Sequence, residues 1–374
     1  MRYFNRDALE VKPLAERKNK LSITNNVQPN SPSAALCDQA LRDIQHTVSR
    51  LVSARKAGAS RMLVFGAHSI KNGLADLLIH LLEKGDITHL ATNGAGIIHD
   101  WEFAFQGQTG ENVELYTAEG QFGIWEETGK YLNLALIIGA YRGFGYGQSV
   151  GAMVQEGGLT VPSDGELKEA IRLSLADGAD AFSADRAAAA ADLLETKRHF
   201  NLGDGFLCVP HRFPEHSVAA AAVRLGIPFT CHPMIGHDII YTHPMNKPAA
   251  IGRTAERDFL SFADSVSRLE HGIYLSVGSA VMSPMIFEKS LSMSRNVARQ
   301  RGETITDFDI YVVDLAASTW DWSVQGEPPQ DNPAYYLRFC KTFSRMGGKM
   351  TYTSADNRAW LQEILRQLDS GRSS

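Results

Sequence analysis

The stretch from Arg61 to Asp100 constrains the fold more than any other part of the chain. Apolar runs at 61–66 and 88–92 predict two short strands, and the apolar spacing at 71–84 predicts a helix between them. A strand, a crossover helix and a second strand make a parallel βαβ unit. Such a unit places backbone N–H groups and a helix N-terminus at the carboxyl edge of a parallel sheet, where dinucleotides and phosphates bind.

The same alternation returns in the C-terminal half of the chain. It predicts strands at 206–209, 227–231, 273–277, 308–313 and 349–353, and helices at 215–225, 256–269, 284–301, 334–346 and 357–368. Strands that alternate with helices favour a parallel sheet covered on both faces. Right-handed crossovers then favour an α/β fold with a doubly wound, mostly parallel Rossmann-like sheet.

The N-terminal part of the chain precedes this pattern. A polar arm at 1–34 leads into a helix predicted at about 32–56. We therefore expect residues 1–60 to form an N-terminal arm and helical extension, and residues 61–374 to form one Rossmann-like domain. The glycines that crowd the segment from 139 to 158 favour a mobile loop or close helix packing.

The composition argues against several classes of function. With 37 Lys and Arg against 42 Asp and Glu, the formal net charge is −5, which argues against a general nucleic-acid binder. No apolar run reaches the roughly 20 residues of a membrane helix, and the first ten residues lack an apolar signal core. The four cysteines are far apart and form no C-x-x-C pair. We therefore expect reduced thiols in a cytoplasmic protein that does not associate with membranes or bind zinc through cysteine.

Two glycine-containing turns follow predicted strands and are candidates for a nucleotide or phosphate site. One consists of Thr92, Asn93, Gly94 and Gly96, and the other of Gly278 and Ser279. Glycine lets a backbone approach a pyrophosphate closely, although neither turn carries a full G-x-G-x-x-G. A plain tight turn uses glycine as well, so both interpretations stay open.

A second candidate site is the histidine-rich segment at 231–244. It follows a predicted strand and contains His232, His237, Asp238 and His243. Imidazoles and a carboxylate at a strand end can transfer protons or bind a metal. The irregular spacing of the histidines disfavours a metal site, and loop histidines bonded to backbone would give the same pattern. Asp238 can bind a cationic amine, orient an imidazole or stabilise a turn.

A third candidate is an acidic and aromatic loop that contains Trp320, Asp321 and Glu327. Indole faces and carboxylates together suit an organic cation, through cation–π attraction and charge pairing. Trp101 and Glu102, beside Asp100, form a comparable group. Packing of the tryptophans at an interface is the alternative interpretation.

Several segments together resemble the deoxyhypusine synthase family. They are Ser69–Gly73, Thr92–Asp100, Gly236–His243, Val277–Val281, Asp309–Asp321 and Lys349–Ala355, and their order and spacing match the family's over about 61–355. The family's T-T-A-G-G-V-E-E-D, for example, is similar to TNGAGIIHD at 92–100. The resemblance implies a Rossmann-like fold that binds NAD, and a homo-oligomer, usually a tetramer, with sites at subunit interfaces.

The same resemblance implies a reaction and roles for individual residues. Family members oxidise spermidine with NAD and move its aminobutyl group, through an enzyme lysine, to a lysine of a translation factor or to a free polyamine. His243 stands where the family places its base, and Ser354 and Ala355 stand near its contact to the adenosine half of NAD. The carrier lysine, however, is replaced by Ser283. A serine cannot form the imine that carries the group.

The leading hypothesis is therefore an NAD-binding, deoxyhypusine-synthase-like protein that acts on a small amine or polyamine, by amine oxidation or alkylamine transfer. His243 would be its base, and Asp100, Asp238 and Asp321 would hold the cation. A lysine from elsewhere, such as Lys247 or Lys289, would restore a transferase. The alternatives are a metal-assisted hydrolase or lyase on the same fold, and a non-catalytic nucleotide-binding module.

Overall fold

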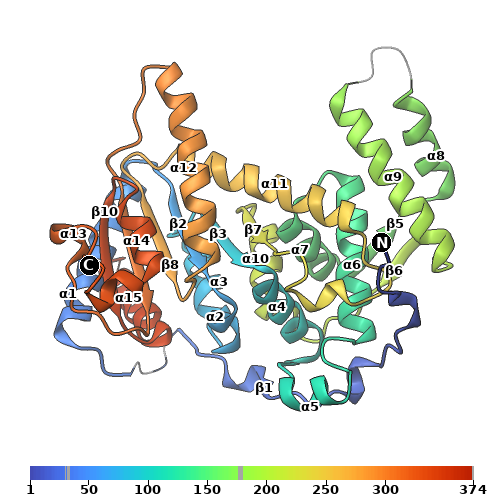
Figure 1. Cartoon of the computed structure of the whole chain (residues 1–374), viewed down its shortest axis with the longest axis horizontal. Coiled ribbons are helices and arrows are strands. Elements are labelled where there is room, and N and C mark those ends of the chain that lie inside the picture. Colours follow the sequence, from blue (N-terminus) through green and yellow to red (C-terminus); the bar gives the residue numbers. More distant parts are fainter. Residues whose placement is uncertain (30, 32–33, 176–179, 373–374) are drawn as a thin grey trace. The chain divides into compact units, whose positions relative to one another are not determined.

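Two compact units, interleaved in the sequence, make up the chain (Figure 1). The computed structural model describes residues 1–29, 31, 34–175 and 180–372. Unit 1 comprises Met1–Thr24, Ile97–Arg224 and Pro233–Asp258, and unit 2 comprises Asn25–Gly96, Leu225–His232 and Phe259–Ser374. The domain boundary expected at residue 60 stays a prediction.

Unit 2 is built on a six-stranded parallel sheet. Its strands are β2 (Arg61–Phe65), β3 (His89–Asn93), β7 (Phe229–His232), β8 (Ile273–Val277), β9 (Asp309–Asp314) and β10 (Lys349–Ser354). They lie in the order β10-β9-β8-β2-β3-β7, and each neighbouring pair is parallel. Counted along the chain from the β7 edge, the order is 3-2-1-4-5-6, which is that of doubly wound dinucleotide-binding folds. The predicted fold class is confirmed.

Helices cover both faces of this sheet. They are α1 (Asp38–Lys56), α2 (Ala67–Lys71), α3 (Ala75–Glu83), α12 (Met282–Gln300), α13 (Trp322–Gln325), α14 (Arg338–Ser344) and α15 (Asn357–Arg372), with a 3-10 turn, η6, at Pro333–Tyr336. α12 packs with α14, whereas α1 packs with α15, which also contacts α3 (Figure 1). The helices that follow β2 and β8 thus lie on opposite faces of the sheet.

The alternation of side chains along each strand explains this double cover. One face of the sheet joins α12 and α14 in a buried core that includes Met62, Val64, Tyr274, Phe287, Ile310 and Phe343. On the other face, Thr353 Oγ1 of β10 donates a 2.8 Å hydrogen bond to Asp43 Oδ2 of α1. Because each buried aromatic or branched side chain contributes about 1.5–3 kcal/mol, the two apolar faces hold the helices in place.

Unit 1 is mainly helical. Its helices are α5 (Val113–Ala118), α6 (Glu126–Arg142), α7 (Tyr146–Glu156), α8 (Asp164–Leu173), α9 (Ala181–His199) and α10 (Val218–Leu225), together with most of α4 (Gly94–Gln106) and the first half of α11 (Pro248–Ser267). Two antiparallel ribbons join β1 (Leu21–Ser22) to β4 (Gln108–Thr109) and β5 (Gly158–Val161) to β6 (Gly205–Cys208). Short 3-10 turns are η1 (Arg6–Ala8), η2 (Leu14–Glu16), η3 (Ile23–Asn25), η4 (Pro214–His216) and η5 (Ile239–Tyr241).

Glycine allows two helices of unit 1 to pack closely. A Cβ on Gly139 of α6 would lie 1.9 Å from Ser149 Oγ of α7, so no larger residue fits without moving the helices. α6 then ends at Gly143, whose φ of +82° favours glycine. For Gly139, close helix packing is therefore the correct one of the two interpretations.

The N-terminal arm is held to unit 1 by a buried ion pair. The Arg17 guanidinium donates to both oxygens of Glu102, over 2.8 and 2.7 Å, and both side chains are 1% exposed. Thr128 and Thr109 donate to the same carboxylate. Although burial favours the neutral acid, Arg17 and these hydrogen bonds hold the pKa of Glu102 below its usual value.

Several elements differ from the sequence predictions. The helix predicted at 71–84 is two helices, because Gly73 has a φ of +78° and its Cβ position lies 2.7 Å from the Asn25 carbonyl oxygen. The strand predicted at 206–209 is β6, which pairs antiparallel with β5 outside the parallel sheet. The helix predicted from residue 32 begins at Asp38, and residues 32 and 33 lie outside the described part of the chain. The first two differences arise from tertiary contacts that local patterns do not encode.

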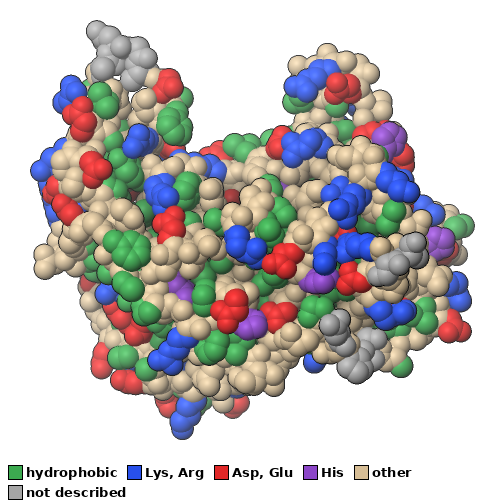
Figure 2. All heavy atoms as spheres, turned by 180° about the vertical axis from the view of Figure 1, so that it is seen from behind, with side chains coloured by type: hydrophobic (Ala, Val, Ile, Leu, Met, Phe, Trp, Pro, Cys, Tyr) green, Lys and Arg blue, Asp and Glu red, His purple; other side chains and the backbone are tan. Residues whose placement is uncertain are grey.

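Charged side chains of both signs are interspersed on the face shown in Figure 2. This distribution agrees with a nearly balanced composition of 37 basic and 42 acidic residues. Among the described helices, none combines the length and the hydropathy that crossing a membrane requires.

Candidate functional site

The carboxyl edge of the unit 2 sheet is the main candidate site. β2 and β8 are neighbours there, and their following helices leave to opposite faces, which is the topological switch point at which doubly wound sheets bind ligands. The predicted cofactor residues all lie at this edge or just beyond it: Thr92 and Asn93 in β3, Gly94 and Gly96 in α4, Gly278 and Ser279 after β8, and Ser354 and Ala355 at the end of β10.

Two glycines bring the loops after β2 and β8 together at the switch point. Gly66 N donates to Val277 O over 3.3 Å, and a Cβ on Gly66 would lie 2.2 Å from the Gly278 carbonyl oxygen. Gly278 itself has a φ of +59°, and its Cβ position lies 2.4 Å from Asn357 Nδ2 at the start of α15. Glycine is thus required at both positions by the close approach of the two loops and of Asn357; Gly66 is buried and Gly278 is half-buried.

Buried polar atoms without partners lie near these glycines. Asn357 Oδ1 and Ser69 Oγ have no hydrogen-bond partner, and the two residues are 8% and 0% exposed. Native proteins leave few buried polar atoms unpaired, so a water or a ligand atom is expected against each. From the sequence, Ser69 was named only within the resembling segment Ser69–Gly73, and Gly66, Ser69 and Asn357 were not assigned to a site, because their meeting depends on the strand order.

The segment 92–96 is a strand end and a helix start, rather than the glycine turn that was predicted. β3 ends at Asn93, α4 begins at Gly94, and Asn93 Oδ1 accepts a 2.9 Å hydrogen bond from Gly96 N. Thr92 Oγ1 donates to Phe65 O over 3.1 Å, and a Cβ on Gly96 would lie 2.1 Å from that hydroxyl. Packing against Thr92 is therefore sufficient to require glycine at 96.

Ser283 lies inside the core of unit 2. It is 0% exposed, and its Oγ is 2.9 Å from the Tyr274 hydroxyl. Ser279 Oγ accepts a hydrogen bond from Ser283 N over 3.3 Å, at the beginning of α12. Burial raises the pKa of Tyr274, which keeps this hydroxyl pair neutral. The Ser283 side chain thus makes an internal contact at the position where the resemblance expects a carrier lysine.

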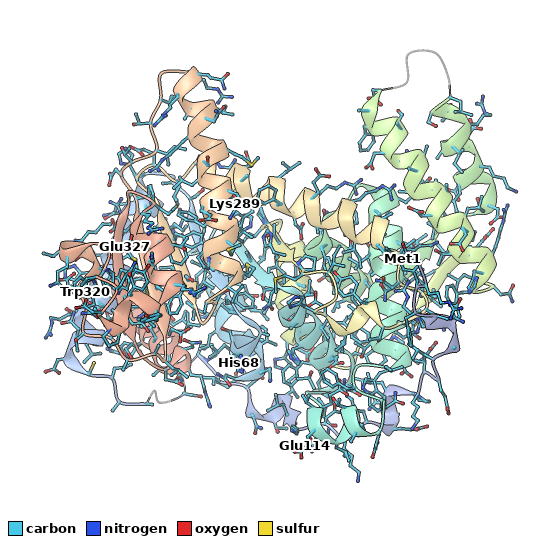
Figure 3. All side chains as sticks on the ribbon, viewed as in Figure 1. Met1, His68, Glu114, Lys289, Trp320 and Glu327 are labelled. Atoms are coloured by element: carbon cyan, nitrogen blue, oxygen red, sulfur yellow. The ribbon has the colours of Figure 1, made fainter. Side chains whose placement is uncertain are left out.

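The two lysines considered as replacements both pair with glutamates. Lys289 of α12 pairs with Glu288 in unit 2 (Figure 3), and Lys247 pairs with Glu195 in unit 1. A lysine that carries an imine must be free to reach the substrate. These contacts do not favour either lysine as a carrier.

The loops after β9 and β10 carry carboxylates that are used locally. Asp314 Oδ1 accepts from Leu315 N over 2.8 Å, and Asp356 Oδ1 caps α15 by accepting from Arg358 N over 2.9 Å. Ser354 is the last residue of β10 and is exposed, and Ala355 N donates to Asp314 O over 3.1 Å. Ser354 is therefore accessible at the carboxyl edge.

The acidic and aromatic loop forms internal bonds in unit 2. Asp321 caps α13 by accepting from Ser323 N over 2.9 Å, and Trp320 Nε1 donates to Gly326 O over 2.9 Å. Glu327, near Trp320 in Figure 3, pairs with Lys341 and Arg345, which hold its pKa below the usual value. Because two cations already neutralise Glu327, its attraction for a polyamine is reduced.

Asp100 of unit 1 is a buried helix cap. It accepts hydrogen bonds from Ser217 Oγ, Val218 N and Ala219 N over 2.7, 2.8 and 3.2 Å, at the start of α10. Burial raises the pKa of its carboxyl to about 6, although these three bonds oppose the shift. The Asp100 carboxylate therefore has a structural role in unit 1, because it caps the start of α10.

His243 of unit 1 is held in one tautomer. Its Nδ1 accepts a 3.1 Å hydrogen bond from Met245 N, so the proton of the neutral ring is on Nε2, 3.3 Å from Glu126 Oε2. Burial lowers the pKa of His243, and Glu126 opposes this. A Cβ on Gly129 would lie 2.5 Å from the ring, so α6 packs directly on the imidazole. Both nitrogens are engaged, so a base role requires one contact to open.

Asp238 is the least satisfied carboxylate among the predicted site residues. Burial raises its pKa to about 6, and its Oδ2 is buried without a hydrogen-bond partner. His237 beside it is exposed, whereas His232 belongs to unit 2. Among the described residues, no three His, Cys, Asp or Glu side chains are grouped as a metal site requires.

A pair of buried histidines in unit 2 was not recognised as a pair from the sequence. His232, at the end of β7, and His89, at the start of β3, are 7% and 0% exposed and are joined through the Thr230 hydroxyl. The sequence contained one indication of this group: residues two apart on a strand share a face, so Thr230 and His232 of β7 were expected on the same face. It could not show that His89 of another strand meets them.

Comparison with known proteins shows only distant structural similarity. No protein-family model and no curated relative matches the sequence. AgrE in a ternary complex with ornithine and NAD⁺ is similar over 91% of this chain, with 14% identity and a TM-score of 0.45, but the chain spans only 34% of its length. A candidate LOR/SDH protein from Methanococcus maripaludis S2 has 11% identity and a TM-score of 0.41, with 92% and 71% of the two chains covered. A candidate deoxyhypusine synthase from Entamoeba histolytica has 11% identity and a TM-score of 0.40, with 89% and 90% covered. TM-scores below 0.5 assign neither a family nor a function.

Proposed function

We propose that the chain is an NAD-binding enzyme that acts on a small amine. The observation that carries the proposal is the switch point between β2 and β8, where Gly66 and Gly278 meet at the carboxyl edge of a sheet with dinucleotide-binding strand order. The motif resemblance to the deoxyhypusine synthase family adds the expectation of an amine substrate.

The residues at this edge fit a dinucleotide, but not through the usual phosphate loop. The turn after β2 lacks G-x-G-x-x-G, and α2 has only five residues, so it offers little helix dipole to a pyrophosphate. The turn after β8 fits better, because Gly278 has no side chain, Ser279 offers a hydroxyl, and Asn357 Oδ1 beside Gly278 lacks a partner. NAD would accordingly be held by Gly278, Ser279 and Asn357, with Ser354 and Ala355 beyond them.

NAD supplies a hydride acceptor for the carbon that bears the amine nitrogen. The protein's own residues would orient the amine and take up its proton. His243 as base and Asp238 as cation-binding residue remain hypotheses from the sequence; within unit 1, the unpaired Oδ2 of Asp238 supports cation binding. Without a lysine at Ser283, we propose oxidation of the amine, with the imine released to water or to a second amine.

Gly278→Ala is the first test of the proposed cofactor site. The added methyl group would collide with the Asn357 side chain and displace it from the proposed cofactor site. We therefore expect NAD affinity to fall at least tenfold, which is about 1.4 kcal/mol. Titration of the purified protein with NAD by calorimetry measures the change. Gly58→Ala is the matched control, because Gly58 has a similar φ of +67° with open space around it. Equal loss of affinity in both variants would contradict a contact at Gly278.

Amine oxidation is tested by NADH formation. Spermidine, putrescine and agmatine are incubated with the protein and NAD, and absorbance of NADH is followed. We expect reduction with at least one of them. If wild-type protein fails to bind NAD at millimolar concentration, the proposed function is wrong.

A nucleotide-binding module without catalysis is the second candidate function. The buried contact between Ser283 and Tyr274 favours it, because this position holds no group able to carry an imine. In this case NAD raises the melting temperature, but no amine raises it further and no NADH forms. Thermal-shift measurements with NAD alone and with NAD plus spermidine distinguish the two functions.

A further inference from the structure

A chain of four polar side chains runs through the buried part of the unit 2 sheet. Ser265 Oγ is 2.8 Å from His89 Nδ1, His89 Nε2 is 3.0 Å from Thr230 Oγ1, and Thr230 Oγ1 is 3.0 Å from His232 Nε2. All four residues are at most 7% exposed. The chain leads from α11 along β3 and β7 to the carboxyl edge, where His232 lies opposite Asn93.

Packing holds both imidazoles in place. The ring of Phe262 lies 5.4 Å from the His89 ring and 5.3 Å from the His232 ring, edge to face in each case. Burial lowers the pKa of both histidines to about 3, and on His89 the charge of Arg268 and the second imidazole add to this effect. Both rings are therefore neutral at any pH near 7, and each carries one N–H.

Counting the available hydrogens shows in which direction the hydrogen bonds from Ser265 to His232 run, that is, which group donates in each of them. If Ser265 donates to His89 Nδ1, His89 donates from Nε2 to Thr230, and Thr230 donates to His232 Nε2, the one hydrogen without an acceptor in the chain is the N–H on His232 Nδ1, at the end of β7. In the reverse direction the Ser265 hydroxyl hydrogen has no acceptor within the chain, and this hydroxyl is buried. An unpaired buried donor is unfavourable, so the first direction is preferred.

This direction leaves the remaining N–H of His232 on Nδ1. Nδ1 makes no hydrogen bond to a described residue, and His232 keeps 7% of its surface exposed at the carboxyl edge. The neighbouring Asn93 uses its Oδ1 to cap α4, and its Nδ2 is a second donor at this end of the sheet. A donor that cannot become charged recognises an uncharged or anionic acceptor and does not attract cations.

We propose that His232 is a ligand-binding residue that donates a hydrogen bond from Nδ1 to an oxygen of the bound nucleotide, and that Thr230, His89 and Ser265 set this tautomer. The inference rests on the proposed function, because it takes NAD as the ligand. The acceptor oxygen can belong to the adenosine half or to the nicotinamide half, both of which carry ribose hydroxyls. His89 and Thr230 are positioning residues in this scheme.

The tautomer is tested without any ligand. Long-range ¹H–¹⁵N spectra of histidine-labelled protein report which ring nitrogen is protonated, and comparison with His232→Asn assigns the signals. We expect an Nδ1–H, Nε2-unprotonated ring for His232 that stays unchanged between pH 6 and pH 8. Thr230→Val should give a mixture of tautomers, whereas Thr230→Ser, which retains the hydroxyl, should behave as the wild type. A wild-type Nε2–H tautomer would overturn the proposed direction.

The ligand contact is tested by NAD titration of matched variants. Asn places an amide nitrogen near the position of Nδ1, so His232→Asn should bind NAD within about threefold of the wild type, whereas His232→Phe should bind it at least tenfold more weakly. ADP-ribose and nicotinamide mononucleotide, titrated separately, show which half of NAD is contacted. If His232→Phe binds NAD as the wild type does, this inference fails while the proposed function stands. If the wild type itself does not bind NAD, the proposed function and the ligand contact both fail.

Discussion

The buried polar groups of the two units are organised differently. In unit 1, Arg17 and Glu102 form a buried ion pair in which the carboxylate also accepts from two threonines. In unit 2, the neutral side chains of Asn357 and Ser69 are buried near the carboxyl edge, and Asn357 Oδ1 and Ser69 Oγ lack a partner. A saturated buried charge stabilises a structure, whereas an unsaturated neutral group at a strand end is able to receive a ligand. The contrast separates a structural position from a candidate ligand position, and Asp238 of unit 1, whose Oδ2 is also unpaired, belongs with the second kind.

The largest expected effect is the loss of stability when the buried ion pair of Arg17 and Glu102 is broken. Glu102→Ala leaves the Arg17 guanidinium buried without its partner, so the free energy of unfolding should fall by about 3–5 kcal/mol. Urea denaturation followed by circular dichroism measures it. Glu169→Ala is the control, because its partner Arg172 lies on the surface of the same unit, where solvent screens the pair, and the loss there should be much smaller. Similar losses of stability in the two variants would show that the buried ion pair contributes no more to unit 1 than the exposed one.

The neutral histidines of unit 2 predict a pH dependence. The folded-state pKa of about 3 for His89 and His232 lies below the unfolded value of about 6.5, so their contribution to stability is present above pH 6.5 and is lost as the pH falls. At pH 5 each histidine should have lost about 2 kcal/mol relative to pH 8.

The carboxyls of Asp100 and Asp238 act in the opposite direction, because burial raises their pKa values to about 6. The measurement is therefore a comparison of unfolding free energies at pH 5 and pH 8 for the wild type and His89→Gln. The variant should lose about 2 kcal/mol less than the wild type between these pH values. An identical pH dependence would show that His89 is protonated in the folded protein.

The smallest effect concerns Asp100 of unit 1. Its hydrogen bonds show that it caps a helix, and the sequence-based hypothesis also gives it a role in substrate binding. Asp100→Asn loses a charge at the start of α10 and one of its acceptor atoms, and should lower the free energy of unfolding by about 1 kcal/mol. Asp180→Asn, at the exposed start of α9, is the control for a helix cap alone. If amine-dependent NADH formation falls in Asp100→Asn but not in Asp180→Asn, Asp100 belongs to the substrate site as well.

Local patterns predicted much of the fold of unit 2. Buried parallel strands are continuous apolar runs, so β2, β8 and β9 could be recognised within about one residue of their bounds. β6 could not, because a short apolar run does not reveal its partner, and β6 pairs with β5 rather than with the parallel sheet. Similarly, the glycines at 94 and 96 predicted a turn, although Gly96 is required by its packing on Thr92.

The candidate site was predicted in part. The polar residues after β3, β8 and β10 were recognised because they directly follow apolar runs. The capping roles of Asp100 and Asp321 were not, since a carboxylate that binds an amine and one that caps a helix have the same sequence context. Ser283, placed by resemblance, was expected near chemistry, and its burial against Tyr274 depends on how α12 packs on β8.

The amino-acid sequence by itself determined the alternation of strands and helices, the parallel fold class and the polar character of the strand ends, because these follow from local hydrophobic spacing. Only the tertiary structure decided the strand order, the approach of Gly66 to Gly278, and the meeting of His89 with His232. These features depend on contacts between residues far apart in the chain. Their energies come from packing and burial, which no short segment contains.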